Sequence, residues 1–345
     1  MNKQLEQLPI PLLNWYRENA RELPWRADPT PYHVWLSEIM LQQTRVAVVH
    51  GYYCHVLEQC PTVADLAALD EDQLLKLWQG LGYYNRARSL HRTAKIIVDE
   101  YGGEFPRDHA AIRALPGIGD YTAGAICSIA FGMPTPAVDG NVLRVVARIT
   151  GDDTDISTLA MKKKVTAELS EVIPTKAPGD FNQAMMELGA TVCLPNGAPL
   201  CEKCPAAPFC EANQKELTDK LPVKAASKAR RVEKRDVFLI FYAGKVALRR
   251  RPPRGLLAGL WEFPNEPAPA DIPVFGLECN GGTCRHIFSH VEWHMKGRVI
   301  YAMDDELPEG WVWADKQELK NTYAIPNAFE GFAQSVEEGM AYSKD

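Results

Sequence analysis

The sequence predicts two domains, an all-α N-terminal domain and an α+β C-terminal domain. Apolar residues recur at helical spacing through residues 8–210 and are interrupted by Pro and Gly turns. After residue 235 the pattern changes to short β-branched and aromatic runs separated by Gly, Pro and Asp. We therefore expect a helical domain over residues 1–213, an exposed basic linker over 214–234, and a second domain over 235–345.

The individual elements follow from the same patterns. In the first domain, helices are expected near residues 34–50, 64–69, 73–79, 86–100, 109–114, 121–131, 142–149, 158–172 and 181–192. In the second domain, strands are expected at residues 237–242, 246–248, 299–301 and 311–313, followed by one helix near 326–338.

The composition is that of an ordinary globular protein, with 46% hydrophobic and 24% charged residues in a chain of 345. A chain of this length can bury a sizeable core in each of two domains. No stretch reaches the ~18 apolar residues that a membrane-spanning helix needs. The first seven residues carry charges where a signal peptide has an apolar run. We therefore expect a cytoplasmic protein, associated with the nucleoid if it binds DNA.

The net charge of −6 does not exclude a nucleic-acid partner, because the charge is unevenly distributed. Residues 215–254 contain 13 Lys and Arg against 4 Asp and Glu, whereas the flanking regions are acidic. Attraction to phosphate acts over a Debye length of ~8–10 Å, so a local basic segment can bind it.

Four of the nine cysteines fall within 18 residues, at Cys193, Cys201, Cys204 and Cys210. In a cytoplasmic protein such a group indicates a metal site before a disulfide. A zinc ribbon usually has two tight pairs, and only Cys201 and Cys204 are tightly spaced here. Ligands from one winding loop suit a bulkier iron–sulfur cluster, which we favour over zinc or free thiols.

Two glycine turns could contact a nucleic-acid backbone. Leu115-Pro-Gly-Ile-Gly119 precedes a helix, so Gly117 and Gly119 can present backbone N–H groups to a phosphate, although a plain turn between helices is the alternative. The second turn, from Gly80 to Arg88, adds two tyrosines and two arginines, Arg86 and Arg88. Amides, arginines and aromatic rings together suit a DNA-backbone reader with a stacking wedge.

Two carboxylates stand out. Glu38 is predicted on a helix, where it shares one stripe with Gln42 and Arg45, and Asp139 precedes the helix that begins near residue 142. The alternatives are a solvated surface glutamate and an N-cap aspartate. Two carboxylates on opposite walls of a cleft can also break a glycosidic bond, since one protonates the leaving group and the other meets the oxocarbenium ion.

Together these motifs resemble the helix-hairpin-helix DNA glycosylases, and specifically the MutY-type adenine DNA glycosylases, which remove adenine mispaired with 8-oxoguanine. The resemblance covers nearly the whole chain. Its motifs are Ser37-Glu-Ile-Met-Leu-Gln-Gln-Thr44, Gly80-Leu-Gly-Tyr-Tyr84, Leu115-Pro-Gly-Ile-Gly119, Val138-Asp-Gly-Asn141, Phe181-Asn-Gln-Ala-Met-Met-Glu-Leu-Gly189 and the four cysteines.

The resemblance implies a monofunctional glycosylase of base excision repair that flips adenine out of the duplex. Glu38 would protonate adenine at N7, and Asp139 would stabilise the sugar cation at C1′. Tyr121 and Asn141 would orient the anionic side of the site. The adenine pocket would be lined by Trp25, Arg26, Leu41 and Gln183, and the wedge residues in the duplex would be Gln43 and Tyr83.

The resemblance also implies a cofactor and a partner. Cys193, Cys201, Cys204 and Cys210 would hold a 4Fe-4S cluster that braces a DNA-contacting loop. The partner would be double-stranded DNA with an adenine:8-oxoguanine or adenine:guanine mispair, bound by a monomer. One departure is the first cysteine gap of seven residues, where the family usually has six. Another is Asp120, a negative charge at the helix start that would contact phosphate.

Residues 235–345 resemble the family's C-terminal domain, a Nudix-like fold similar to hydrolases of oxidised guanine nucleotides. Gly259-Leu-Trp-Glu-Phe-Pro264 matches that fold, but no Arg-Glu-x-x-Glu-Glu metal helix follows it, so we expect no diphosphate hydrolysis. The tripeptide Phe288, Ser289 and His290 matches the loop that reads 8-oxoguanine, although alone it would be an ordinary strand end.

Rival functions differ at identifiable residues. A glycosylase-lyase of the endonuclease III type, acting on oxidised pyrimidines, needs an amine nucleophile in the helix after the glycine turn. Tyr121 occupies that position, and no lysine lies between Lys95 and Lys162. A non-catalytic DNA-binding protein of the same fold need not keep both Glu38 and Asp139, and both are present. A nucleotide hydrolase lacks its metal helix.

Overall fold

The computed structural model describes residues 2–225, 229–265 and 274–343, so residues 226–228 of the expected linker lie outside the described part. Packing divides the chain into two compact units. The first unit contains Met1–Ala68 and Ser89–Ala226, and the second contains Leu69–Arg88 and Ser227–Asp345. The second unit therefore includes a segment from the first half of the sequence.

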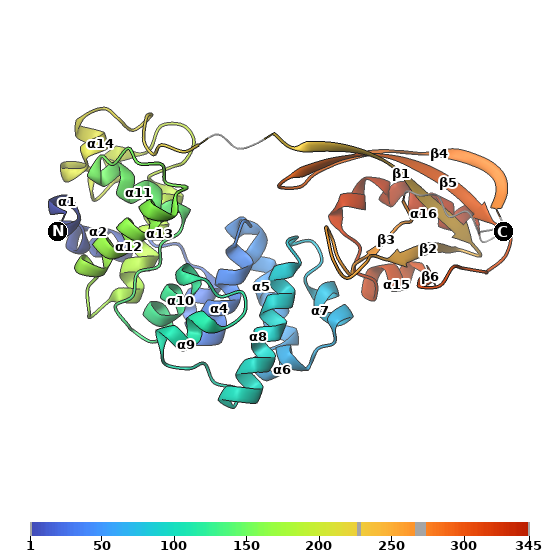
Figure 1. The fold of residues 1–345 in the computed structure, drawn as a ribbon, viewed down its shortest axis with the longest axis horizontal. Helices are drawn as coiled ribbons and strands as arrows, with labels where there is room; N and C mark the ends of the chain where they lie inside the picture. The colour runs from blue at the N-terminus through green and yellow to red at the C-terminus, as the bar shows by residue number, and fades with distance from the viewer. Residues whose placement is uncertain (1, 226–228, 266–273, 344–345) are drawn as a thin grey trace. The chain divides into compact units, whose positions relative to one another are not determined.

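The first unit is helical throughout its described residues, as expected (Figure 1). Its α-helices are α1 (Lys3–Glu6), α2 (Pro9–Asn19), α3 (Pro24–Ala27), α4 (Pro31–Leu41), α5 (Val46–Gln59), α6 (Val63–Ala68), the greater part of α8 (Asn85–Tyr101), α9 (His109–Ala114), α10 (Asp120–Ala125), α11 (Gly140–Thr150), α12 (Leu159–Val172), α13 (Pro178–Thr191) and α14 (Glu211–Gln214). A π-helical turn, Ile126–Ala130, extends α10, and two 3-10 turns, Cys201–Lys203 and Ala207–Phe209, follow α13.

The helix expected near 34–50 is two helices, α4 and α5. Thr30 caps α4 by accepting a hydrogen bond from the backbone N–H of His33, and Pro31 occupies its first turn. The helix ends at Leu41 because the backbone leaves the helical conformation at Gln42, with ψ of 110°, and then becomes left-handed at Gln43, with φ of 58°. The apolar periodicity continues across this break, so periodicity alone could not reveal it.

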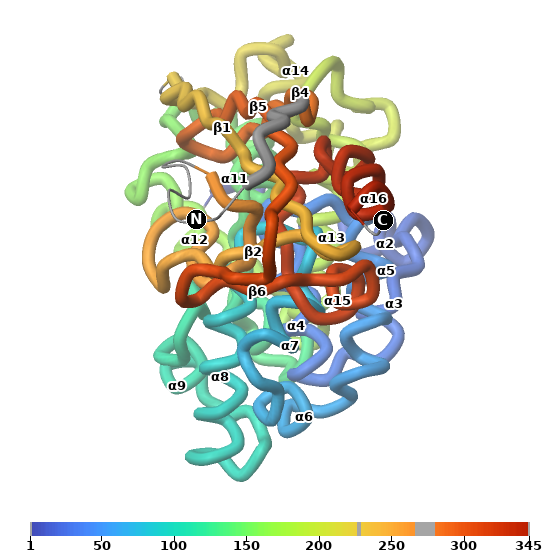
Figure 2. Tube along the Cα trace, turned by 90° about the vertical axis from the view of Figure 1, so that its right-hand side faces the viewer, coloured from blue at the N-terminus to red at the C-terminus, as the bar shows by residue number. Residues whose placement is uncertain are grey.

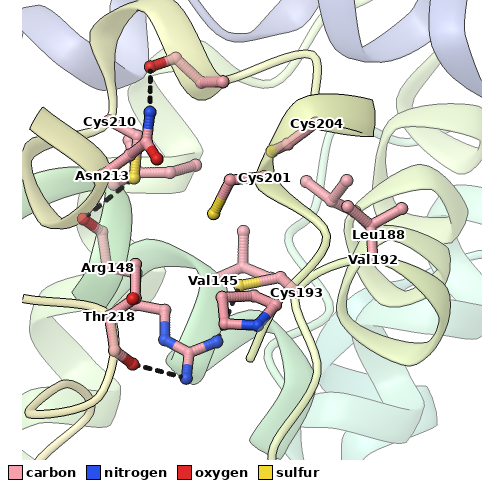
Figure 3. A pocket seen from close by; sticks show the side chains of 13 residues that line it. Val145, Arg148, Leu188, Val192, Cys193, Cys201, Cys204, Cys210, Asn213 and Thr218 are labelled. Carbon is pink, nitrogen blue, oxygen red and sulfur yellow. Dashed lines mark hydrogen bonds between the residues drawn. The ribbon is translucent and has the colours of Figure 1, made fainter. Parts of the chain in front are cut away.

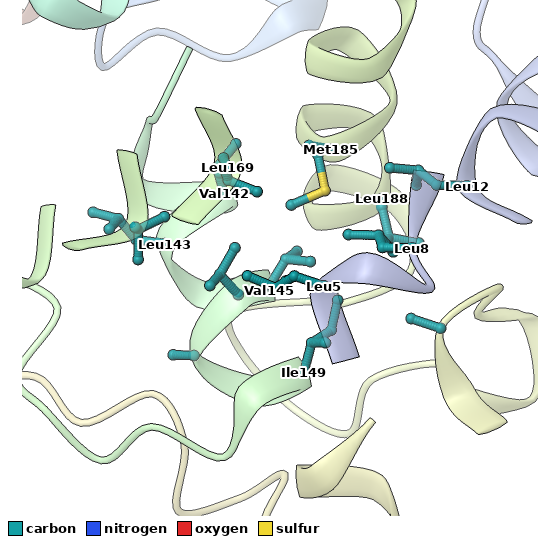
Figure 4. Close-up of a cluster of buried hydrophobic side chains, with 14 of the residues drawn as sticks. Leu5, Leu8, Leu12, Val142, Leu143, Val145, Ile149, Leu169, Met185 and Leu188 are labelled. Atoms are coloured by element: carbon teal, nitrogen blue, oxygen red, sulfur yellow. The ribbon is translucent and has the colours of Figure 1, made fainter. Parts of the chain in front are cut away.

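A buried apolar cluster fixes α11 against α13 and the N-terminal helices (Figure 4). Leu5, Leu8 and Leu12 from the α1–α2 region are fully buried in it. From α11 come Val142, Val145 and Ile149, and from α13 come Met185 and Leu188. Each such side chain stabilises the fold by about 1.5–3 kcal/mol through loss of contact with water. The ends of α11 and α13 are therefore held at fixed positions.

The second unit contains α7 (Glu71–Leu77) and a six-stranded sheet of order β3-β2-β1-β5-β4, with β6 pairing to β2. The strands are β1 (Arg231–Tyr242), β2 (Lys245–Arg250), β3 (Trp261–Glu262), β4 (Val274–Ile287), β5 (Val291–Ala302) and β6 (Trp311–Ala314). Figure 2 shows β1 and β5 running alongside each other, and they pair in parallel from Arg231 and Val291 onward. The other pairings are antiparallel. This α+β domain agrees with the predicted class.

Helices cover one face of this sheet. Phe329 and Phe332 of the 3-10 helix η4 (Asn327–Phe332) and Val336 of α16 (Ala333–Tyr342) pack on Phe241 and Trp293 of the sheet. The helix expected near 326–338 is therefore two elements, and a further helix, α15 (Lys316–Asn321), precedes them with a capping box at Asp315.

Four strands differ from expectation. β3 was not expected, and β5 begins eight residues before the run at 299–301 that predicted it. β1 begins six residues before the apolar run that predicted it, because the basic residues at its start pair with β5. β4 was not expected, since Gly281, Gly282 and few β-branched residues give it a weak strand signal. In the described part of the chain, no helix is both long enough and apolar enough to cross a bilayer.

Candidate active site

A cavity of about 750 Å³ in the first unit is lined by residues from α3, α4, α10, α11 and α13 and the turns between them. It brings together eleven of the residues singled out from the sequence. They are Trp25, Arg26, Glu38, Leu41, Gln43, Gly117, Gly119, Tyr121, Asp139, Asn141 and Gln183.

Glu38 lies on α4 and is 6% exposed, unlike a solvated surface glutamate. Its pKa is raised to about 7, chiefly by burial; the Tyr121 hydrogen bond opposes this rise, and the nearby Asp139 adds to it. The Tyr121 hydroxyl donates to the Glu38 carboxylate. Burial also raises the pKa of Tyr121 well above its ordinary value, so the phenol remains a donor. A carboxyl group with a pKa near 7 can carry a proton at neutral pH and deliver it.

Asp139 is the N-cap of α11 and also lines the cavity. Its carboxylate accepts hydrogen bonds from the Val142 backbone N–H at 2.8 Å and from the Asn141 amide at 2.7 Å. Burial raises the pKa of Asp139, and these hydrogen bonds oppose the rise. The cap and the pocket position are compatible because one oxygen binds the helix end while the amide fixes the other.

A hydrogen-bond chain connects Asp139 to the first cysteine of the loop. The Asn141 side-chain oxygen accepts from the Arg144 guanidinium at 2.9 Å, and Arg144 also donates to the carbonyl of Cys193 at 2.9 Å. Arg144 further donates to the carbonyl of Gly189 at 2.8 Å. A Cβ at Gly189 would lie 2.6 Å from the Cβ of Asn141, so α11 and α13 approach as closely as only glycine allows.

Glu187 is a residue of this cavity that sequence reasoning missed. Its buried carboxylate accepts from Arg21 at 2.5 Å and from Arg26 at 2.7 Å. Burial alone would raise its pKa, but the hydrogen bonds from the two arginines leave the pKa below its usual value. The sequence spacing could have indicated this position, because Glu187 follows Gln183 by four residues on α13 and so lies on the same face of the helix.

The remaining pocket residues supply apolar and polar walls. Trp25 is 7% exposed and makes an edge contact with Tyr53 at 5.5 Å between ring centroids. Arg26 lies over the ring of Tyr16 and is bound to Glu187. Gln43 lies two residues after the end of α4 and has a left-handed backbone. An aromatic wall with a few convergent polar groups suits a flat heterocycle.

The turn from Leu115 to Gly119 joins α9 to α10 at the edge of this cavity. Gly117 has φ of 75°, and a Cβ there would lie 2.6 Å from the Cβ of Ser89. Glycine is therefore required both by the left-handed backbone and by the lack of room for a side chain. Asp120 pairs with Arg113 at 2.5 Å, and this hydrogen bond lowers its pKa. The negative charge noted from the sequence is thus compensated within the fold.

The four clustered cysteines line one small pocket behind α11 and α13 (Figure 3). All four are free thiols. Arg148 donates to the Cys193 sulfur at 3.3 Å and to the carbonyl of Leu194. Burial raises the pKa of Cys204 to about 12, so a thiolate here requires a positive partner. Within residues 2–225, 229–265 and 274–343, no three His, Cys, Asp or Glu side chains are arranged to hold one metal ion.

The other predicted residues belong to the second unit, where they line a cavity of about 680 Å³: Tyr83, Arg86, Arg88, Phe288, Ser289 and His290. Phe288, Ser289 and His290 connect β4 to β5. The hydroxyls of Tyr83 and Ser289 are 3.1 Å apart. Arg88 pairs with Glu71 at 2.7 Å and donates to the carbonyl of Ala258.

Comparison with known proteins assigns this arrangement to a class. Residues 36–175 match the family described as "HhH-GPD superfamily base excision DNA repair protein", and residues 236–335 match the NUDIX domain. A solved thermostable thymine-DNA glycosylase is similar, with a TM-score of 0.55 and 28% identity over 62% of this chain and 98% of that one. An endonuclease III in a non-covalent DNA complex gives 0.52 and 26% over the same shares. The fold and the site define an enzyme of the helix-hairpin-helix DNA N-glycosylase class.

Relatives narrow the class. The adenine DNA glycosylase of Homo sapiens is 38% identical over 92% of this chain and 72% of its own length. That of Buchnera aphidicola subsp. Acyrthosiphon pisum is 35% identical over 84% and 85%. The chain belongs to the family of MutY-type adenine DNA glycosylases, and the resemblance seen in its motifs is confirmed.

Proposed function

We propose that the protein excises adenine from duplex DNA where adenine is mispaired with 8-oxoguanine or guanine, by hydrolysis of the N-glycosidic bond without strand cleavage. The observation that carries the proposal is a buried Glu38 with a pKa of about 7 in the same cavity as Asp139. Adenine is a poor leaving group until it is protonated, so an acid that holds its proton at neutral pH is the first requirement.

Glu38 is the acid in this proposal, and it delivers its proton to N7 of the flipped base. Tyr121 holds the Glu38 carboxylate through its hydroxyl and so fixes the direction of transfer. Departure of adenine leaves positive charge at C1′ of the sugar. Asp139 stabilises that charge, and the Asn141 amide at 2.7 Å orients its carboxylate. Water then adds at C1′ and yields an abasic site.

The adenine pocket is assigned to Trp25, Arg26, Leu41 and Gln183. Glu187 supports it by neutralising and fixing Arg26 through the 2.7 Å ion pair. Gln43, at the exposed end of α4, is assigned to the space that the flipped base leaves in the duplex. Gly117 and Gly119 supply backbone N–H groups for phosphate, with Asp120 neutralised by Arg113.

Recognition of the opposite base is assigned to the second unit. 8-Oxoguanine differs from guanine by an oxygen at C8 and a hydrogen at N7, so its reader needs an acceptor and a donor close together. The Ser289 hydroxyl supplies both, and the backbone of Phe288 and His290 supplies more. The proximity of the Tyr83 hydroxyl to Ser289, at 3.1 Å, supports a joint role beside that base.

A 4Fe-4S cluster is assigned to Cys193, Cys201, Cys204 and Cys210. The four thiols border one pocket, and only Cys201 and Cys204 are tightly spaced, whereas a zinc ribbon usually has two tight pairs; this favours a cluster over zinc. A bound cluster supplies iron–thiolate bonds that brace the loop after α13. The chain's own contribution is Arg148, whose guanidinium donates to the Cys193 sulfur and offsets its negative charge.

The proposal is tested by incubating purified protein with duplexes that carry adenine opposite 8-oxoguanine, guanine or thymine. We expect abasic sites in the first two duplexes, with the fastest excision opposite 8-oxoguanine. Duplexes with an oxidised pyrimidine test the endonuclease III-type rival in the same assay. Excision of the pyrimidine with adenine left intact would overturn the proposal.

A further inference from the structure

The turn that carries Tyr83 has an unusual backbone. It lies in the second unit and connects α7 to the start of α8, and both of its glycines, Gly80 and Gly82, have positive φ. Tyr83 itself has φ of 49°, a conformation that L residues rarely adopt. Its side chain is 47% exposed. A large ring on so short a turn keeps one direction only if other groups hold the turn.

Arg86 contacts this turn on several sides. Its Nη2 donates to the carbonyls of Leu81 and Gly82, both at 3.1 Å. Its guanidinium carbon lies 5.4 Å from the centre of the Tyr83 ring and 5.5 Å from that of Trp78. The indole N–H of Trp78 donates to the same Gly82 carbonyl at 3.1 Å. One cation therefore engages the backbone of the turn and the ring that the turn presents.

The position of Arg86 is electrostatically unfavourable for a positive charge. Arg86 lies in the first turn of α8, where the helix dipole repels a cation. Burial also lowers its pKa, to about 10. The carbonyls of Leu81 and Gly82 and the faces of two rings compensate these costs. Arg86 is half-buried, and its guanidinium is engaged by the turn and the two rings, whereas an arginine that binds DNA phosphate directs its guanidinium toward the DNA.

We propose that Arg86 is a positioning residue for Tyr83: it holds the turn and the ring in the geometry that enters the duplex, and it is not a ligand of the DNA backbone. The inference rests on the proposed function, in which Tyr83 acts beside the opposite base, and on the wedge role that the family resemblance implies for Tyr83. It replaces the phosphate contact that the sequence suggested for Arg86.

The first test is a double-mutant cycle in single-turnover excision of adenine opposite 8-oxoguanine. Arg86→Lys keeps the charge and loses the planar fork, so it should slow excision about tenfold in the unaltered chain and less than about twofold in a Tyr83→Ala background. Arg92→Lys, the same change at an exposed position of α8, is the matched control and should have no effect. Equal slowing in both backgrounds would overturn the inference.

The second test distinguishes the effect of the hydrogen bonds that hold the turn from the effect of the positive charge of Arg86. Trp78→Phe removes the other donor to the Gly82 carbonyl while every charge remains, and it should reproduce part of the Arg86→Lys defect. Arg86→Met should leave the salt dependence of DNA binding unchanged, whereas loss of a phosphate contact lowers the slope of log K against log salt by about 0.9. A lowered slope, or an unaffected Trp78→Phe variant, would contradict the proposal even if Arg86→Lys folds poorly.

A fluorescent readout follows the wedge directly. The duplex contains a 2′-fluorinated adenosine, which resists excision, opposite 8-oxoguanine. The fluorescent base 2-aminopurine is placed next to the 8-oxoguanine, and its fluorescence increases when it is unstacked. The unaltered chain should raise the fluorescence, Tyr83→Ala should not, and Arg86→Lys should give less than half the rise. If the unaltered chain excises no adenine from the cleavable duplex of the first test, the proposed function fails. If it excises adenine and Arg86→Lys keeps the full rise, only the role of Arg86 fails.

Discussion

The hydroxyl of Tyr121 donates to the carboxylate of Glu38 across the cavity of the first unit, from α10 to α4. This contact ties the group proposed as the acid to the helix that follows the Leu115–Gly119 turn. Any contact of that turn with DNA therefore acts on the same helix that orients the acid. In the proposed function, the orientation of the acid and the contact with phosphate therefore depend on the same helix, α10.

Glu38→Gln should lower the rate of adenine excision at least ~10²-fold, because the amide keeps the shape and cannot deliver a proton. The unaltered enzyme should lose about tenfold in rate per pH unit above about 7, where its acid ionises. Single-turnover rates from pH 5 to 9 check both, with Glu22→Gln as the control. A flat profile above pH 7 would remove Glu38 from the role of acid.

The same raised pKa has a consequence for stability. Between about pH 4.5 and 7 the folded state holds a proton on Glu38 that the unfolded state has lost, so the free energy of unfolding falls as pH rises through this window. Glu38→Gln lacks this loss and should be more stable than the unaltered chain at pH 8, by up to about 3 kcal/mol. Urea unfolding at pH 5 and 8 measures the difference, and equal stability at both values would contradict it.

Asp139→Asn should distinguish the role of Asp139 as the N-cap of α11 from its proposed role in catalysis. Asn caps a helix as well as Asp, so stability should change by less than about 1 kcal/mol. Excision should fall at least ~10²-fold, because the neutral amide does not stabilise positive charge at C1′. Asp108→Asn makes the same change at the cap of α9, outside the cavity, and should retain full activity.

Glu187→Gln should destabilise the fold by about 2 kcal/mol at pH 7, because it leaves Arg21 and Arg26 without their counter-charge; partial exposure of Arg21 moderates the cost. The pKa of Glu187 is lowered, so its contribution is present above the unfolded value of 4.5 and is lost as pH falls through the folded value. The deficit should therefore shrink in acid. Unfolding curves at pH 7 and 4 test this, with exposed Glu171→Gln as the control.

Cys204→Ser should abolish most of the iron and acid-labile sulfide in anaerobically purified protein and reduce soluble yield several-fold. The unaltered protein should be brown, with about four irons and four sulfides per chain. Cys54→Ser, at a free thiol outside the cysteine pocket, should retain the full content. Stoichiometric zinc without sulfide in the unaltered protein would exclude a cluster.

Borohydride should trap little covalent protein–DNA complex, since a phenol at position 121 forms no imine. Among the residues that line the cavity, Lys162 is the one lysine. Lys162→Ala should leave trapping at the same low level, and strands should break only after alkali or heat. Efficient trapping by the unaltered chain would favour the lyase rival, and its loss in Lys162→Ala would identify the amine.

Features encoded locally could be predicted from the sequence. Asp139 precedes its helix as an N-cap must, and the Gly117 turn is marked by its own residues. Glu187 could not be paired in this way, because Arg21 lies 166 residues away and only the packed fold brings them together. The break after α4 could not be predicted because the apolar periodicity continues across it, and β4 could not because Gly281 and Gly282 weaken its strand signal.

The composition of the second unit from two distant segments also has a consequence for folding during translation. Its Leu69–Arg88 segment leaves the ribosome long before Arg231, the first residue of β1, and at ~5–20 residues per second that interval is roughly 7–30 s. During this time the nascent chain has α7 and the Gly80–Tyr83 turn without the strands they pack on, whereas the cluster around α11 and α13 can already close. We therefore expect the last step of folding to be the docking of the early Leu69–Arg88 segment on the late strands, after the β4–β5 hairpin with Ser289 has been translated.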